Sequence, residues 1–207
     1  MLRVLLVIAL LVSGHWAFSQ VRQQVDKLNR LALRQMRKDP DSCRLFLKRS
    51  IKIAGSEAYF KGLANALNVK ARLSQVEGND LEAFRTYQKA LVHYAKSDSV
   101  VSNNQAIVLR NMAAILLEKY QYKDAISFYD SSEYRLRQYI SERPERSRKT
   151  NKFKSLNDIM YYRALAQKRS GKLLDANKTL NLLWKEAKQQ NNGSDHARVL
   201  IQLGLVK

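Results

Sequence analysis

Residues 67–90 read LNVKARLSQVEGNDLEAFRTYQKA, and this stretch decides the fold class. A small residue, Ala71, follows an apolar residue by four positions, so the two share one face of a helix, one turn apart. Gly78 then marks a turn, because glycine tolerates the positive φ that ends many helices. After the turn, Ala83 and Tyr87 repeat the four-residue spacing. The pattern predicts two antiparallel helices that approach closely at their small residues.

The same skeleton occurs twice more along the chain, from Leu109 to Ser132 and from Met160 to Leu183, and a further copy begins at Leu200. Beyond residue 20 the apolar residues recur at helical spacing, and no strand-like alternation stands out. The sequence therefore predicts an all-α protein built from helix pairs. We expect these pairs at about 22–54, 57–96, 103–140 and 153–190, with an incomplete pair at 195–207.

The repeated skeleton resembles the tetratricopeptide repeat, a helix-turn-helix unit of 34 residues. The resemblance covers most of residues 57–207, while residues 22–54 look like a degenerate first pair. The spacings from Ala83 to Ala125 and from Ala125 to Ala176 are 42 and 51 residues, longer than the family value. The resemblance implies an αα-hairpin solenoid over residues 20–207 with an extended concave surface. An ordinary helical bundle is the alternative.

Boundary residues fit this arrangement. Pro40 and Pro144 are expected at breaks between helices, since proline interrupts a helix that precedes it. Gly78 and Gly171 are expected in the turns inside two of the pairs. Asn79, three residues before a glutamate, predicts a capping box at the start of a helix.

The composition of the 207 residues points the same way. Seven Gly and two Pro are few for an all-β sandwich or barrel. Hydrophobic residues make up 45% of the chain, which rules out a disordered polybasic tail despite a net charge of +19. The single cysteine, Cys43, excludes an internal disulfide or a CxxC site, so we expect it to be buried or to pair with another molecule.

The first 19 residues predict a secretory signal peptide. Arg3 precedes the nine-residue apolar run VLLVIALLV at 4–12, and Ala17 and Ser19 are the small residues of a cleavage site before Gln20. Nine helical residues cover roughly half of the hydrocarbon thickness of a bilayer. We therefore expect export to the periplasm or the cell exterior, with an uncleaved membrane anchor as the alternative.

No residue pattern indicates catalysis. His15, His93 and His196 have no companion His, Cys or carboxylate at ligand spacing, and the sequence contains no HExxH, GxSxG, P-loop or GxGxxG motif. We expect a non-enzymatic protein without a metal site or a cofactor.

The tetratricopeptide resemblance also implies which residues line the concave surface, through the first helix of each pair. Those proposed for partner binding are Asn65, Asn68, Arg72, Arg110, Asn111, Tyr161, Tyr162, Lys168 and Arg169. Asparagine amides can hold a peptide backbone, and Arg and Tyr are frequent at binding hot spots. The family's carboxylate clamp is rejected, because only Asn111 falls on a clamp position, whereas Asp158 and Tyr162 stand where bases belong. The expected partner is a protein or peptide, with an acidic one favoured by the basic side chains.

The segment 143–154 is a second basic region, with six basic residues among twelve. A solvated, flexible loop is the simplest reading, and contact with an anionic membrane surface or an acidic partner is the alternative. Nucleic acid is a poor candidate, because only Phe153 supplies an aromatic ring there and an exported protein rarely meets nucleic acid.

Two functions follow from the sequence. The leading one is an exported, non-enzymatic scaffold that binds protein or peptide. The alternative is the N-terminal sensory region of a bacterial membrane signalling protein, a histidine kinase or a transcriptional regulator, with its output domain outside this chain. The incomplete pair at 195–207 adds the expectation that the chain is a fragment or is covered by a partner there.

Overall fold

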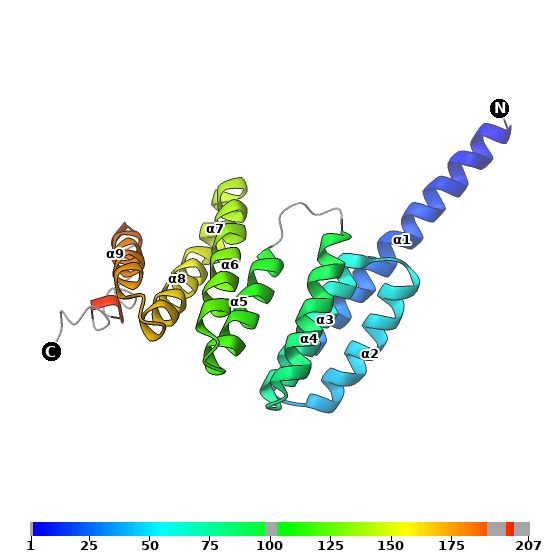
Figure 1. Ribbon diagram of the computed structural model, residues 1–207. Helices are drawn as coiled ribbons and strands as arrows, with labels where there is room; N and C mark the ends of the chain where they lie inside the picture. Colours follow the sequence, from blue (N-terminus) through cyan, green and yellow to red (C-terminus); the bar gives the residue numbers. More distant parts are fainter. Residues whose placement is uncertain (1, 98–102, 190–197, 201–207) are drawn as a thin grey trace. The chain divides into compact units, whose positions relative to one another are not determined.

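The computed structural model describes residues 2–97, 103–189 and 198–200, with side chains from Phe18 onward. Within these ranges every regular element is a helix, so the all-α prediction is confirmed (Figure 1). The helices are α1 (Leu2–Gln35), α2 (Pro40–Ser56), α3 (Phe60–Val76), α4 (Asp80–Ala95), α5 (Asn103–Glu118), α6 (Tyr122–Glu142), α7 (Pro144–Lys149), α8 (Lys152–Arg169) and α9 (Leu173–Gln189).

The chain divides into two compact units, Met1–Val100 and Val101–Lys207. In the first unit, α1 packs on α2 and α3, and α3 packs on both α2 and α4. In the second, α6 packs on α5 and α8, and α8 packs on α9. The continuous domain expected over 20–207 stays a prediction, and so does the incomplete pair at 195–207, of which only residues 198–200 are described.

Two predicted helix breaks are confirmed, because each proline opens a helix. Pro40 is the first residue of α2, and the carboxylate of Asp39 before it accepts a hydrogen bond from the backbone N–H of Ser42 at 3.0 Å. Pro144 is likewise the first residue of α7. Asn79 stands at the N-cap position of α4, yet its side chain makes no capping bond, so the predicted capping box is wrong. Its backbone N–H instead closes the preceding turn on the carbonyl of Ser74 at 2.8 Å.

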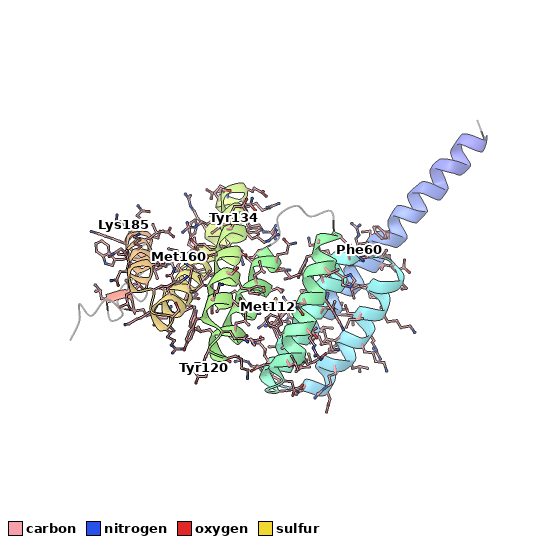
Figure 2. The ribbon with its side chains drawn as sticks, viewed as in Figure 1. Phe60, Met112, Tyr120, Tyr134, Met160 and Lys185 are labelled. Carbon is pink, nitrogen blue, oxygen red and sulfur yellow. The ribbon has the colours of Figure 1, made fainter. Side chains whose placement is uncertain are left out.

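The turns inside three helix pairs use one backbone conformation. Gly78 has φ 79° and Gly171 has φ 81°, which confirms both as turn residues. Tyr120, at the same place between α5 and α6, has φ 62° although it carries a side chain (Figure 2). The left-handed conformation is therefore required by the turn, and the turn between α5 and α6 adopts it without a glycine.

In the three described copies of the repeated skeleton, the alanines at the two helix positions are buried between helices. In the first unit they include Ala71 and Ala83, and their counterparts in the second are Ala113, Ala125, Ala164 and Ala176. Large side chains fill the space around them; Met112, Tyr129 and Met160 are almost fully buried in the second unit. In both units the helices therefore approach closely at small residues, and large side chains fill the core around these contacts.

In the first unit α1 approaches α3 closely at Gly62. A Cβ atom there would collide with the Tyr59 ring and lie 2.6 Å from Cγ1 of Val25. Nearby, the Asn29 amide donates to the Gly62 carbonyl at 2.9 Å, and the Ser50 hydroxyl donates to the Asn29 amide oxygen at 2.7 Å. These buried bonds join α1, α2 and α3.

Cys43 is fully buried in the core of the first unit. Burial was one of the two states expected for this cysteine. Burial raises the pKa of its thiol, so the reactive thiolate is disfavoured. It packs with neighbouring apolar side chains that include Met36, Leu47 and Leu73.

Candidate functional site

The three expected binding residues of the first unit lie on α3, and two of them serve the helix packing. Asn65 accepts a hydrogen bond from the Tyr94 hydroxyl at 2.6 Å, which ties α3 to α4. Asn68 is only 8% exposed. Arg72 is partly buried on the same helix. The Asn65 amide therefore contributes to the hairpin itself, whereas Asn68 is buried and its Oδ1 makes no hydrogen bond in the described structure.

The second unit brings the expected residues of α5 and α8 together, and we call this surface the α5–α8 face. It contains Arg110 and Asn111 from α5 and Tyr161 and Tyr162 from α8. Arg110 donates to the amide oxygen of Asn111 at 3.3 Å, and both are partly buried. Since α5 and α8 contact each other, cationic, amide and aromatic groups share this face.

Aromatic rings organise this face. The rings of Tyr162 and Tyr129 are stacked with centroids 6.5 Å apart, and Tyr161 meets Tyr162 edge-on at 5.4 Å. Tyr162 is 40% exposed, whereas Tyr129 is buried beneath it. The guanidinium of Arg198 lies 4.1 Å from the ring centroid of Tyr161. A buried ring thus supports an exposed one, which fixes its orientation.

The buried Tyr129 hydroxyl lies within electrostatic reach of both Arg110 and the carboxylate of Glu118. Burial raises the pKa of the Tyr129 hydroxyl well above its usual value, helped by the neighbouring Tyr162 hydroxyl and opposed by the positive charge of Arg110. The hydroxyl therefore stays protonated and can donate a hydrogen bond at any physiological pH.

Lys152, at the start of α8, extends the positive charge of the face. Burial lowers the pKa of its ammonium, and the positive charges of Arg110 and Arg146 lower it further. Three cations from α5, α7 and α8 therefore lie within electrostatic reach of one another. An anionic group placed among them would relieve this repulsion.

The prediction of a flexible loop at 143–154 is wrong. Residues 144–149 form α7, and α8 begins at Lys152. Glu145 in the first turn and basic residues in the last turn suit the helix dipole, and Glu145 pairs with Arg148 at 3.1 Å. Ser147 faces the interior of the unit and is fully buried.

Lys168 and Arg169 occupy a different place from the other expected residues of this unit. Both are exposed in the last turn of α8. They lie about 24 Å along the helix from Lys152, at 1.5 Å for each residue. Cations at a helix C-terminus interact favourably with its dipole. Asp158, where a clamp base was expected, is paired with Arg198 at 2.9 Å.

Sequence reasoning missed two members of the α5–α8 face. Tyr129 lies within the repeat skeleton from Leu109 to Ser132 and Lys152 within the segment 143–154, and neither was among the residues expected on the concave surface. The position of Tyr129 four residues after the buried Ala125 was a signal for its inward direction, but nothing local indicated that an exposed ring would stack on it.

The described residues contain neither a metal-binding cluster nor a membrane-spanning helix. No group of three or more His, Cys, Asp or Glu side chains is arranged to hold a metal ion there. In the same residues, no helix combines the length and the apolar character needed to cross a bilayer.

Comparisons with known proteins assign no family. No family model matches the chain, and no curated protein matches it. A solved structure, BtubC (BKLC) from P. vanneervenii, is similar at 15% identity with a TM-score of 0.41, over 89% of this chain and 87% of that one. A likeness this weak assigns neither a family nor a function.

Proposed function

We propose that this is a non-enzymatic, exported helical-repeat protein of the tetratricopeptide type, which binds an acidic protein or peptide. The observation that carries the proposal is the α5–α8 face, where Arg110 bonds Asn111 on α5 and the exposed Tyr162 ring stacks on the buried Tyr129. Lys152 adds a positive charge within electrostatic reach of Arg110. Aromatic and guanidinium groups on rigid helices are the usual anchors of protein interfaces.

Each group of the face has a binding role that its geometry allows. The Asn111 amide is oriented by Arg110 and can contact a peptide backbone. The exposed Tyr162 ring offers apolar area at a small entropic cost, because the Tyr129 ring already restricts it. Arg110 and Lys152 supply charge for a carboxylate. An extended acidic peptide with aromatic residues matches all of these.

The export half of the proposal rests on the N-terminal pattern of charge, apolar run and small residues before Gln20. Among the described side chains, which start at Phe18, the first buried one in α1 is Val25. Cleavage before Gln20 would therefore leave the core contacts of α1 in place. Mass spectrometry of the protein secreted by its host tests this, since an intact Met1 would contradict cleavage.

The binding half is tested with a fluorescent peptide of alternating Asp, Phe, Glu and Gly. The double variant Arg110→Glu with Lys152→Glu should weaken binding by about tenfold or more, because charge-assisted contacts are lost and repulsion replaces them. Tyr162→Ala should weaken it through lost ring contact. The control variant, Lys178→Glu with Lys185→Glu, makes the same charge change at exposed positions of α9. Equal loss in both double variants would mean unspecific charge attraction and would reject this site.

A further inference from the structure

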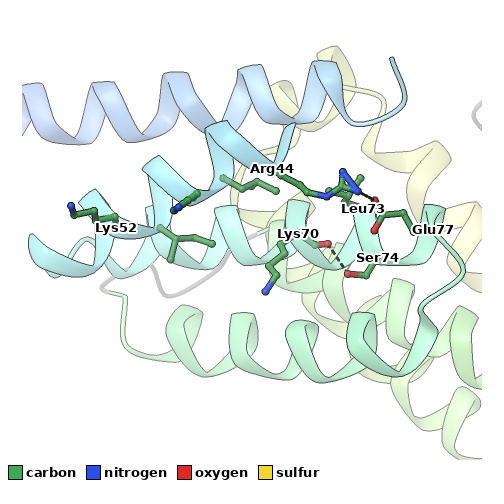
Figure 3. Close-up of a pocket in the computed structure, with 9 residues that line it drawn as sticks. Arg44, Lys52, Lys70, Leu73, Ser74 and Glu77 are labelled. Carbon is green, nitrogen blue, oxygen red and sulfur yellow. Dashed lines mark hydrogen bonds and ion pairs between the residues drawn. The ribbon is translucent and has the colours of Figure 1, made fainter. Parts of the chain in front are cut away.

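A second surface, in the first unit, has the properties of a docking groove. A cavity of about 430 Å³ lies along α2 and α3, and we call it the α2–α3 groove (Figure 3). Leu47 and Ile51 from α2 and Leu73 from α3 supply its apolar lining. The inference goes beyond the proposed function, because the groove shares no residue with the α5–α8 face.

The rim of the groove is basic. Arg44, Lys48 and Lys52 follow one another at four-residue spacing along α2, and Lys70 stands on α3. Residues four apart share a helix face, so the three α2 cations form a row about 12 Å long at 1.5 Å per residue. Figure 3 shows Arg44 and Lys52 toward opposite ends of the groove.

The acidic side chains near the rim neutralise only part of this charge. Glu77, the one carboxylate that lines the groove, pairs with Arg44 at 2.8 Å. Lys70 lies 3.8 Å from Glu82. Lys48 and Lys52 are exposed and make no ion pair with any residue in the described part of the chain. Two unpaired ammonium groups thus border an apolar lining. A partner complementary to this groove therefore carries carboxylates beside aliphatic side chains.

We infer that the α2–α3 groove docks an amphipathic helix of a partner protein, with acidic residues at four-residue spacing beside two or three large aliphatic side chains. The aliphatic side chains enter between Leu47, Ile51 and Leu73, and the acidic residues face Lys48 and Lys52. A helix presents its side chains with the same period as the row on α2, so several charges are matched at once.

Two other occupants fit less well. A fatty acid has one carboxylate, which satisfies one cation of the row and leaves the others unmatched. A second copy of this chain carries the same net charge of +19, so the two copies repel each other. The charge pattern therefore favours an acidic helical partner.

The test uses a fluorescent, helix-favouring 14-residue peptide with Leu on one face and Glu beside it, measured by anisotropy. Three peptides serve as controls: one with Lys for Glu, one with Ser for Leu, and one with the same residues in scrambled order. The full chain should bind the Leu/Glu peptide about tenfold or more tightly than each of them, since both charge and apolar contact contribute.

The location is tested by Lys48→Glu with Lys52→Glu, which should weaken binding of the Leu/Glu peptide about tenfold or more. The matched control, Arg30→Glu with Arg34→Glu, makes the same charge change at the same spacing on exposed positions of α1 and should change binding less than twofold. Hydrogen exchange adds a readout independent of mutation, with the peptide slowing exchange of exposed amides in 44–52 and 70–77.

Several results would overturn the inference. These are no binding of the Leu/Glu peptide, equal affinity for the Ser or scrambled peptide, or equal loss in the two double variants. Dodecanoate that binds in a manner sensitive to the Lys48 and Lys52 changes, while the peptide does not bind, would assign the groove to an acyl anion instead. None of these results depends on Arg110 or Tyr162, so the proposed function is judged separately.

Discussion

Nη2 of Arg137 on α6 lies 2.7 Å from Oε1 of Glu186 on α9, and this ion pair joins helices that are 49 residues apart in sequence. Nε of Arg137 also lies 2.8 Å from Glu133. The other oxygen of Glu133 is 2.7 Å from Nη1 of Arg163 on α8. Glu133 is 7% exposed and joins α6 to α8 from a buried position, and Arg137 extends the network to α9.

This network gives the first prediction. Glu133→Gln keeps the shape but removes the charge between two arginines, so it should lower the free energy of unfolding of the second unit by about 1–3 kcal/mol. Asp130→Asn removes an exposed partner of Arg163 and should cost less than about 1 kcal/mol. Trp184 belongs to α9, so its fluorescence in urea reports this unit once Trp16, the other tryptophan of the sequence, is replaced by Phe. Equal costs would contradict a central role for Glu133.

The second prediction concerns the contact of α1 with α3. Gly62→Ala places a methyl group against the Tyr59 ring and Val25, so the first unit should lose about 1–3 kcal/mol of stability through overpacking. Gly55→Ala is the matched control, because a Cβ there has nothing within 4 Å. It should raise stability by about 0.4–1 kcal/mol by restricting the unfolded chain. Urea unfolding followed by circular dichroism measures both, and a neutral Gly62→Ala would show that the helices separate easily.

The turn between α5 and α6 gives the third prediction. Tyr120 has φ 62°, a conformation that costs an L-residue about 1–2 kcal/mol relative to glycine. Its side chain is 75% exposed, so little contact is lost with it. Tyr120→Gly should therefore raise the stability of the second unit by about 0.5–1 kcal/mol, after the greater chain entropy of glycine is subtracted.

The reverse change is the control for this turn. Gly171→Ala at φ 81° should lower stability by about 1–2 kcal/mol, and a Cβ there has open space, so backbone strain is its only cost. Both variants lie in the second unit and are compared by Trp184 fluorescence. A loss of stability in Tyr120→Gly would show that its ring contact with Tyr122 outweighs the strain.

These cases also show how far the sequence determines the structure. The turns at Gly78 and Gly171 and the helix starts at Pro40 and Pro144 were predictable, because each depends on local backbone chemistry. The ordered α7 was missed, because a count of basic residues hides the proline at its start and the Glu145 of its first turn, both of which suit a helix N-terminus.

The binding surfaces were less predictable than the helices. Asn65 was assigned to partner binding, but its amide is bonded to Tyr94, 29 residues further along the chain. The α2–α3 groove depends on which faces of two helices remain uncovered after packing. Such outcomes follow from tertiary contacts, which the spacing of residues along one helix does not specify.

The last prediction is a pH dependence from His93. Burial, and then the charge of Lys96, lower the pKa of His93 below its usual value near 6.5. Its ring stacks on Phe60 at 6.2 Å, and its Nδ1 is buried without a hydrogen bond in the described structure. Above about pH 6.5 both the folded and the unfolded chain hold a neutral His93, so this residue leaves stability unchanged.

As the pH falls through about 6.5, the unfolded chain takes up a proton that the folded state resists, so the first unit should lose stability until the pH reaches the lower folded pKa. His93→Gln removes this term, and the urea midpoint of the variant should fall less between about pH 7.5 and pH 5 than that of the unchanged protein. The difference between the two proteins isolates His93, because all other titrating groups are common to both. A larger fall in the variant would mean that the folded state instead favours the protonated ring, with the stacked Phe60 face as the group that would stabilise it.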